Sequence, residues 1–318
     1  MASTNNNNRN NKRASKPQSN RASNTSKNSK NTVNRNPRQG WQPPKKSNAP
    51  LISSIVGGIL VVVIVVILIV VSMSSSSTKQ LGQSAASADL VSAVTQIPTS
   101  VYNAVGTGGS LVASPPTKLK SPALTSNGKP EVLYMGDEWC PYCGAERWAL
   151  IVALSRFGKL SGLETAYSSS TDVYPDTPTF TLVNVQYSSP YISFVEVEMQ
   201  TVARATLQTP TAQESNLINK YSNNNIPFID IGGKWTSSAN YSPQVLQGLT
   251  QQSVAANLSS ASSQTTQSIV GSANYLSATF CSIDGDQPAD VCNSAGVIAA
   301  KASLKIPTTT SKNNHSHI

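Results

Sequence analysis

The most strongly apolar stretch of the chain covers residues 51–71, where none of 21 consecutive side chains is charged. At the rise of an α-helix, this length matches the roughly 30 Å hydrocarbon core of a bilayer. A buried helix of a soluble protein usually keeps a polar face over such a length, and a cleaved signal peptide has a shorter apolar region behind a shorter leader. The pattern therefore predicts one transmembrane helix over residues 51–71.

After this stretch, apolar positions alternate between helical and strand-like spacing, which is typical of an α/β domain. Residues 88–106 have helical spacing that Pro98 divides into two short helices. The pair Asn127–Gly128 is a hairpin signal, and a strand is predicted directly after it, over residues 131–135. A helix with a broad apolar face is predicted over residues 141–157.

The second half of the chain continues this alternation. Residues 179–199 predict two strands around a Ser-Ser-Pro turn, and residues 211–222 predict a helix. Residues 226–235 predict a strand, a Gly-Gly turn and the start of another strand. Residues 242–302 predict further helix, and we expect residues 303–318 to be a disordered tail.

Charge gives the predicted membrane span an orientation. Residues 1–50 contain eleven Lys or Arg and no Asp or Glu, and their richness in Asn and Ser predicts a disordered tail. Without this tail, 24 minus 11 leaves 13 basic residues against 15 acidic ones, so the formal net charge of +9 belongs to the N-terminus. Basic residues before a span predict a cytoplasmic tail and an extracytoplasmic domain after residue 71.

We therefore expect a single-pass protein of the cell membrane, with the lipid bilayer as a partner and no nucleic acid as a partner. Residues 72–87 are rich in Ser and predict a flexible stalk. In this orientation every cysteine lies in a compartment where disulfides persist.

The first two cysteines stand two residues apart, where the predicted strand gives way to the predicted helix. Cys140 falls at the N-cap or first turn, where free backbone N–H groups and the helix dipole favour a thiolate. Cys143 lies on the same helix face, within reach of a disulfide bond. Thiol–disulfide exchange needs this arrangement, because one sulfur attacks and the other resolves. Trp139 offers an apolar platform beside the attacking sulfur.

The strings "WCPYC" and, far downstream, "NIPFIDIGG" resemble the thioredoxin superfamily. The resemblance implies a cis-proline at Ile226–Pro227, opposite the cysteines, with the Ile226 backbone open to a bound substrate chain. The longer strings "CPYCGAERWALIVALSRFG", "SSSTDVYPDTPTF" and "FCSIDGDQPADVC" resemble the domain-of-unknown-function 929 family of membrane-anchored, thioredoxin-like proteins.

The expected fold class is α/β. A thioredoxin-like domain over residues 88–302, with a helical C-terminal region, follows one transmembrane helix. About twenty residues, 159–178, separate the motif helix from its next strand. The thioredoxin pattern has a short loop there, so we expect an insertion or an irregular strand.

Cys281 and Cys292 enclose a loop that contains Gly and Pro, which favours a structural disulfide. A second redox pair that relays electrons to the Cys140–Cys143 motif is the alternative. A zinc ribbon would need a second pair as close as Cys140 and Cys143, so neither a metal nor another cofactor is expected.

Three residues of the motif helix have more ordinary interpretations. Glu146 and Arg147 are interpreted as a solvated pair, in preference to a proton-handling role for Glu146. Trp148 is interpreted as a core residue because of its position on the helix face.

Two functions are consistent with these patterns. The first is a membrane-tethered thiol–disulfide oxidoreductase that acts on protein cysteines outside the cell. In it Cys140 and Cys143 are catalytic, and Trp139, Ile226 and Pro227 bind substrate. Its partners would be protein thiols or disulfides and a membrane redox partner. The second is a non-catalytic thioredoxin-like binding module whose motif is locked as a disulfide. No residue sets the direction of electron flow, so reductase, oxidase and isomerase remain open.

Overall fold

The computed structural model describes residues 83–308 of the 318-residue chain. The predicted basic tail, the predicted transmembrane helix at 51–71 and most of the predicted stalk lie outside the described residues, as do residues 309–318. Among the described residues, no helix is both long enough and apolar enough to cross a bilayer.

The described residues form a mixed α/β fold around a central sheet of six strands. The order is β2–β11–β10–β4–β3, and β9 also pairs with β4, in parallel. The strand β10 pairs with β4 in the antiparallel direction. The strand bounds are β2 Thr117–Lys118, β3 Thr125–Ser126, β4 Lys129–Gly136, β9 Ser193–Glu198, β10 Phe228–Ile231 and β11 Trp235–Ser237.

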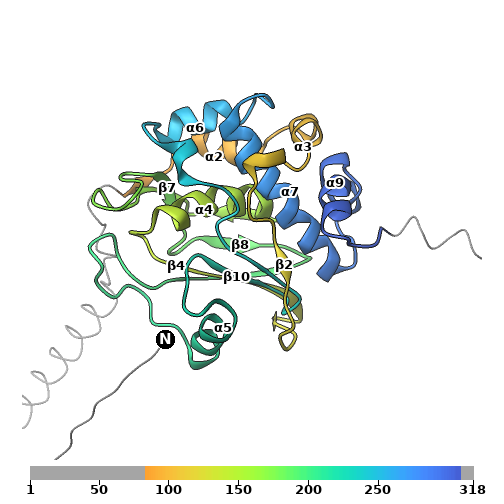
Figure 1. Cartoon of the computed structure of the whole chain (residues 1–318), viewed down its shortest axis with the longest axis horizontal. Helices are drawn as coiled ribbons and strands as arrows, with labels where there is room; N and C mark the ends of the chain where they lie inside the picture. Colours follow the sequence, from red (N-terminus) through yellow and green to blue (C-terminus); the bar gives the residue numbers. More distant parts are fainter. Residues whose placement is uncertain (1–82, 309–318) are drawn as a thin grey trace, which may run out of the picture. The chain divides into compact units, whose positions relative to one another are not determined.

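The central strand β4 supplies side chains to both faces of this sheet, because successive residues of a strand point in opposite directions. Val132 and Tyr134 belong to the larger apolar core, together with the helices α4 (Pro141–Leu154) and α7 (Gln264–Asp284). Leu133 and Met135 belong to a smaller core beneath the helix α5 (Ala212–Ser222). Figure 1 shows α4 and α7 on one face of the sheet and α5 on the other.

A second, smaller sheet packs against α4. Its order is β1–β6–β7, with bounds β1 Ser84–Ala85, β6 Glu164–Tyr167 and β7 Pro178–Thr181. The predicted insertion at 159–178 therefore contains regular strands, including β5 (Lys159–Ser161), which pairs with β8 (Gln186–Ser188). Residues 84–85, which the sequence assigns to the flexible stalk, pair with β6, because that strand offers an unpaired edge.

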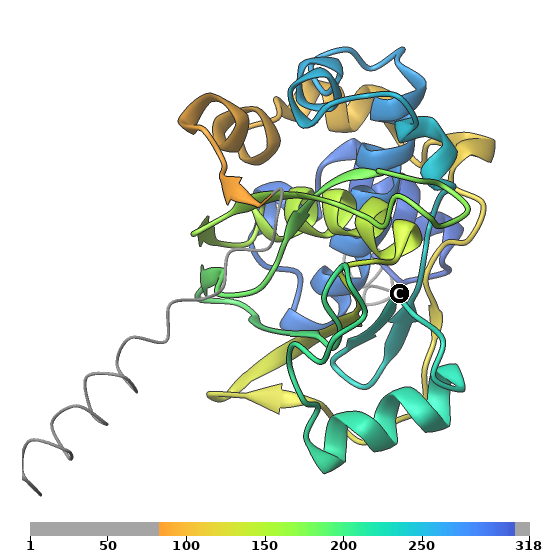
Figure 2. The ribbon, with the colours of Figure 1, turned by 90° about the vertical axis from the view of Figure 1, so that its left-hand side faces the viewer.

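Helices from both ends of the described chain pack around α7 and α4. The first are α2 (Ala88–Thr95) and α3 (Thr99–Val105), separated by Pro98 as predicted, and then the short η1 (Gly109–Leu111). The C-terminal region, predicted only as helical, divides into five elements with α7 as the longest. The others are η2 (Pro243–Leu246), α6 (Gln251–Asn257), α8 (Ala289–Cys292) and α9 (Ala295–Ser303). Figure 2 shows α5 on one side of the central sheet and α2, α3 and α6 on the other.

Two features join the C-terminal helices to the rest of the fold. The predicted disulfide between Cys281 and Cys292 is present, with Cα atoms 5.7 Å apart, and links α7 to α8. Arg156, just after α4, stacks 4.0 Å from the ring centroid of Tyr102 in α3 and donates hydrogen bonds to Asn274 and Ser277 in α7. These contacts hold α4, the helix that carries the cysteine motif, in the middle of the molecule.

Candidate functional site

Cys140 is the N-cap of α4, directly after the central strand β4. Its backbone is extended and its sulfur accepts a hydrogen bond of 3.3 Å from the backbone N–H of Cys143, as an N-cap side chain does. The Cys143 thiol, the N–H groups of Cys143 and Tyr142 and the charge of Arg147 together lower the pKa of Cys140, although burial acts against them. The sequence-based expectation for this cysteine is confirmed in its position.

Cys143 has the opposite environment. Its side chain is completely buried, and burial, together with the neighbouring Cys140, raises the pKa of its thiol well above the ordinary value. Arg147 and the backbone N–H of Asp137 oppose this shift only in part. The two motif thiols are thus chemically distinct: one is disposed toward the thiolate and the other is held as a thiol.

An open groove of about 490 Å³ lies at the N-terminus of α4. Three residues predicted for the site, Trp139, Cys140 and Ile226, line it together. Pro227 is buried directly behind Ile226, and the peptide bond between them is cis, as the resemblance implied. Cys143 does not reach the groove. The remaining lining residues are Asp137, Pro141, Tyr142, Asp172, Met199, Gln200, Asn224 and Asn225.

Segments far away in sequence hold the groove's aromatic wall in place. The indole N–H of Trp139 donates a 2.9 Å hydrogen bond to Gln200, and the Arg204 guanidinium stacks 3.7 Å from the centroid of the Trp139 ring. Arg204 also forms an ion pair of 3.4 Å with Asp172 in the loop between β6 and β7. The region predicted as an insertion therefore reaches the motif and forms part of the groove.

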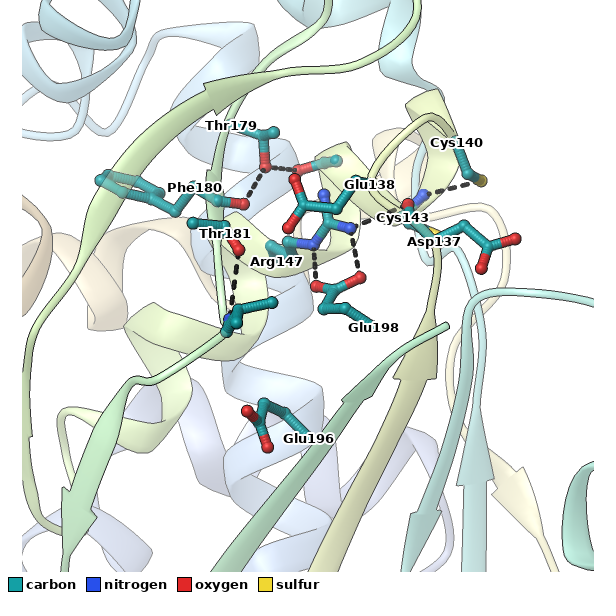
Figure 3. A network of polar contacts seen from close by, with 12 residues as sticks. Asp137, Glu138, Cys140, Cys143, Arg147, Thr179, Phe180, Thr181, Glu196 and Glu198 are labelled. Carbon is teal, nitrogen blue, oxygen red and sulfur yellow. Dashed lines mark hydrogen bonds and ion pairs between the residues drawn. The ribbon is translucent and has the colours of Figure 1, made fainter. Parts of the chain in front are cut away.

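Behind the motif, Arg147 and Glu198 form a bidentate ion pair. The Nε and Nη2 atoms of Arg147 each lie 2.7 Å from a Glu198 oxygen, and Nη2 also donates to the Asp137 carbonyl at 2.9 Å (Figure 3). Both side chains are fully buried. The interpretation of Arg147 as part of a solvated pair is therefore wrong, because β4 and β9 cover this side of α4.

Glu146 is buried as well, and it does not pair with Arg147. Its carboxylate accepts hydrogen bonds from the backbone N–H and the side-chain amide of Asn240, at 3.1 and 2.8 Å. Burial raises the pKa of Glu146 well above its ordinary value. The prediction of a solvated side chain is wrong here too. Trp148 is a core residue as predicted, and its indole N–H donates to the Pro178 carbonyl.

One signal in the sequence could have identified Arg147. It follows Cys143 by four residues and Cys140 by seven, which places all three on one face of a helix. A cation on that face stabilises a thiolate in a medium of low dielectric constant. Arg147 accordingly adds to the lowering of the Cys140 pKa, which the Cys143 thiol dominates, and it opposes the larger effect of burial, which raises the pKa of Cys143.

Acidic groups gather around this cation. Asp137 and Glu138 precede the motif and are buried, and Glu198 faces them across Arg147 (Figure 3). Burial raises the pKa of Asp137, and it raises the pKa of Glu198 to about 7 against the opposing effect of Arg147. Arg147 favours the charged form of Glu198, so the two side chains act as an ion pair behind the motif.

A possible set of metal ligands within residues 83–308 lies elsewhere, at Cys281, Asp286 and Cys292. Its two sulfurs are bonded to each other, and a metal ligand must be a thiolate. Asp286 is already paired with Lys301 at 2.6 Å. This cluster therefore fits a cross-link better than a metal centre.

Comparison with known families identifies a match over residues 115–282, more than half of the chain, with the family described as domain of unknown function (DUF929). The chain belongs to this family. The region matched to DUF929 contains both motif cysteines, Ile226–Pro227 and Cys281, and it ends before Cys292. No curated protein and no solved structure matches the chain.

Proposed function

We propose that this DUF929 protein is a thiol–disulfide oxidoreductase that acts on protein cysteines through Cys140 and Cys143. The observation that carries the proposal is that two thiols in one turn of helix have pKa values shifted in opposite directions. Cys140 lines the groove, although only 4% of its surface is exposed, and its pKa is lowered, whereas Cys143 is fully buried behind it and its pKa is raised. An attacking and a resolving thiol need these properties.

In the reducing direction, the Cys140 thiolate attacks one sulfur of a substrate disulfide and forms a mixed disulfide, and the other substrate sulfur leaves as a thiolate. Cys143 then gives up its proton and attacks the Cys140 sulfur. The Cys140–Cys143 disulfide forms, and the second substrate sulfur leaves and takes up a proton. Two electrons pass from the protein dithiol to the substrate disulfide, and the reverse sequence oxidises a substrate dithiol.

A thioredoxin-like fold is part of the proposal. The motif follows a central strand and opens a helix, which supports it. Further support comes from β4 lying between the parallel β9 and the antiparallel β10, and from the cis-proline that precedes β10. Ile226 borders the groove next to Cys140, so an extended peptide can lie across its backbone.

We also propose that residues 51–71 anchor this domain outside the membrane, because the run is apolar and basic residues precede it. Protease added to intact cells should then remove the domain and leave residues 1–50 protected. If the domain is protected instead, the proposed orientation is reversed. The thiol chemistry is tested separately, with purified full-length protein.

Trapping tests the enzymatic proposal. In full-length protein with Cys143→Ser, Cys140 can attack but cannot be released, so adducts with partner proteins should accumulate on non-reducing gels and disappear with reductant. The matched control carries both Cys140→Ser and Cys143→Ser and should show none. If the single variant forms no more adducts than the double variant, the oxidoreductase proposal fails, and the binding module with a locked disulfide takes its place.

A further inference from the structure

The hydroxyl group of Tyr134 is buried beneath the motif without a hydrogen-bond partner. Tyr134 is a central residue of β4 and has no exposed surface, and its oxygen has no partner within residues 83–308. Most buried polar groups in proteins are paired, so an isolated hydroxyl in a rigid core requires an explanation. Nothing in the packing of β4 requires this oxygen, because a phenylalanine ring would fill the same space.

The hydroxyl and the Cys143 sulfur lie beside the same glycine. A side-chain carbon added to Gly136 would collide with the Tyr134 oxygen and would lie 3.2 Å from the Cys143 sulfur. Because position 136 has no side chain, nothing attached to it separates these two atoms. The Tyr134 hydroxyl therefore lies near the Cys143 sulfur, on the buried side of the cysteine motif.

The charged groups around Tyr134 come from three elements. Arg147 of α4 lies 5.9 Å from the centroid of its ring, Glu198 belongs to β9, and Cys140 and Cys143 lie at the start of α4. Burial raises the pKa of Tyr134 well above the ordinary value, with Glu198 and the two cysteines acting in the same direction and Arg147 against them. The phenol therefore keeps its proton and acts as a donor.

The backbone N–H of Asp137 and the charge of Arg147 stabilise the thiolate of Cys143 only in part. To resolve a mixed disulfide, Cys143 must become a thiolate in a site where burial opposes charge. We propose that the Tyr134 hydroxyl donates a hydrogen bond to the Cys143 sulfur as that sulfur loses its proton and attacks Cys140. This inference rests on the proposed exchange reaction and assigns Tyr134 to its second step alone.

A small aromatic disulfide separates the two steps. Cys140 attacks it and releases one aromatic thiolate, and Cys143 then attacks Cys140 and releases the second, so rapid mixing with absorbance detection records two phases. In Tyr134→Phe the first phase should be unchanged. The pH midpoint of the second phase should rise by about one unit, because a hydrogen bond to a charged sulfur is lost. Its rate at neutral pH should fall only about threefold, since a less acidic thiol is a stronger nucleophile.

Tyr241→Phe is the matched control. Tyr241 is also buried against α4, but its hydroxyl donates a 2.6 Å hydrogen bond to the Ala145 carbonyl. Tyr241→Phe should lower the melting temperature and leave both phases and their pH midpoints unchanged. Tyr134→Phe should leave the melting temperature nearly unchanged, because the hydroxyl that it removes has no partner in the resting state. It should shift the pH midpoint of the second phase alone.

The possible failures are distinguishable. If the unmodified protein releases only the first thiolate, Cys143 does not resolve and the proposed exchange function fails. If the unmodified protein shows both phases and Tyr134→Phe shows the same second phase at every pH, the exchange function stands and the role assigned to Tyr134 is wrong. A shift of both phases together would also overturn it, because the hydroxyl would then act on the motif as a whole.

Discussion

Arg147 and Glu198 share two hydrogen bonds of 2.7 Å in a site from which solvent is excluded, directly behind the motif cysteines. The pair joins α4 to β9, and so connects the helix that carries the thiols to the central sheet. A buried ion pair is not strongly stabilising as a whole, but removal of one partner leaves the other charge buried and uncompensated.

Arg147→Met should therefore destabilise the protein by about 3–5 kcal/mol, because Glu198 would be left without its counter-charge. Arg204→Met is the matched control. It breaks the Arg204–Asp172 pair, in which the arginine side chain is 54% exposed, and exposed pairs contribute only about 0–1 kcal/mol. Denaturant unfolding of both variants measures the difference. Equal losses of stability would show that the buried pair has no special structural role.

The two motif thiols should react at different pH values. In Cys143→Ser, alkylation of Cys140 should reach half its maximal rate below the ~8.5 of a free cysteine, since the serine hydroxyl can donate in place of the Cys143 thiol, and backbone N–H groups and Arg147 still stabilise the thiolate. In Cys140→Ser, the midpoint for Cys143 should lie above that value because the thiol is buried. Alkylation rates between pH 5 and 10 test this, and in denaturant the two midpoints should converge. Equal midpoints in the folded protein would contradict the assignment of Cys140 as the attacking thiol and Cys143 as the resolving thiol.

The Cys281–Cys292 disulfide should matter for stability and not for exchange. Replacement of both cysteines by Ser removes a cross-link between residues 11 apart, which costs about 3 kcal/mol in the chain-entropy model. Rates of aromatic thiolate release should remain as in the unmodified protein. For the double variant, calorimetry measures the loss of stability and rapid mixing measures the rate of thiolate release. Loss of turnover at an unchanged melting temperature would instead favour the electron-relay interpretation.

Asp230 should make stability depend on pH. Burial raises its pKa to about 6, and although one oxygen accepts a 2.7 Å bond from the Gly233 N–H, the other has no partner among the described residues. The folded state thus binds a proton more tightly than the unfolded state, whose aspartate titrates near ~3.9. Its stabilising contribution is complete below about pH 4 and is lost as the pH rises through about 6.

Asp230→Asn tests this effect, since the amide oxygen can still accept from Gly233. Denaturation midpoints at pH 4, 5, 6 and 7 should fall more steeply for the unmodified protein than for the variant. Glu198, with a pKa of about 7, and Asp284, with a pKa of about 6, contribute slopes of the same sign in both proteins and cancel in the comparison. Parallel curves would show that Asp230 does not titrate in this range.

Much of the fold could be predicted from local pattern. The break at Pro98, the hairpin at Asn127–Gly128 and the helix after Cys140 each depend on a few neighbouring residues, and the structure has all three. The cis bond at Pro227 and the Cys281–Cys292 disulfide also agree with expectation. These features are determined by turn chemistry, helix capping and proximity along the chain.

The failures come from tertiary packing. A solvated face was predicted for Glu146 and Arg147 because charged residues usually mark the exposed side of a helix. In this fold the central sheet, α7 and the small sheet of β1, β6 and β7 surround α4, so the side opposite the main core is covered as well. The partners of the buried charges, Asn240 and Glu198, lie more than fifty residues away, and local periodicity cannot identify them.

The match to DUF929 is narrower than the unit that folds. Residues 115–282 omit α2, α3, α8 and α9, although Leu90, Tyr102 and Val297 from these flanking segments are buried in the same core as α4. A recombinant fragment cut at these limits would expose the surfaces of α7 that α3 and α9 cover, and it would leave Cys281 without Cys292. Insolubility of such a fragment would then reflect where it was cut, and a fragment of residues 83–308 keeps the core and both cysteine pairs together.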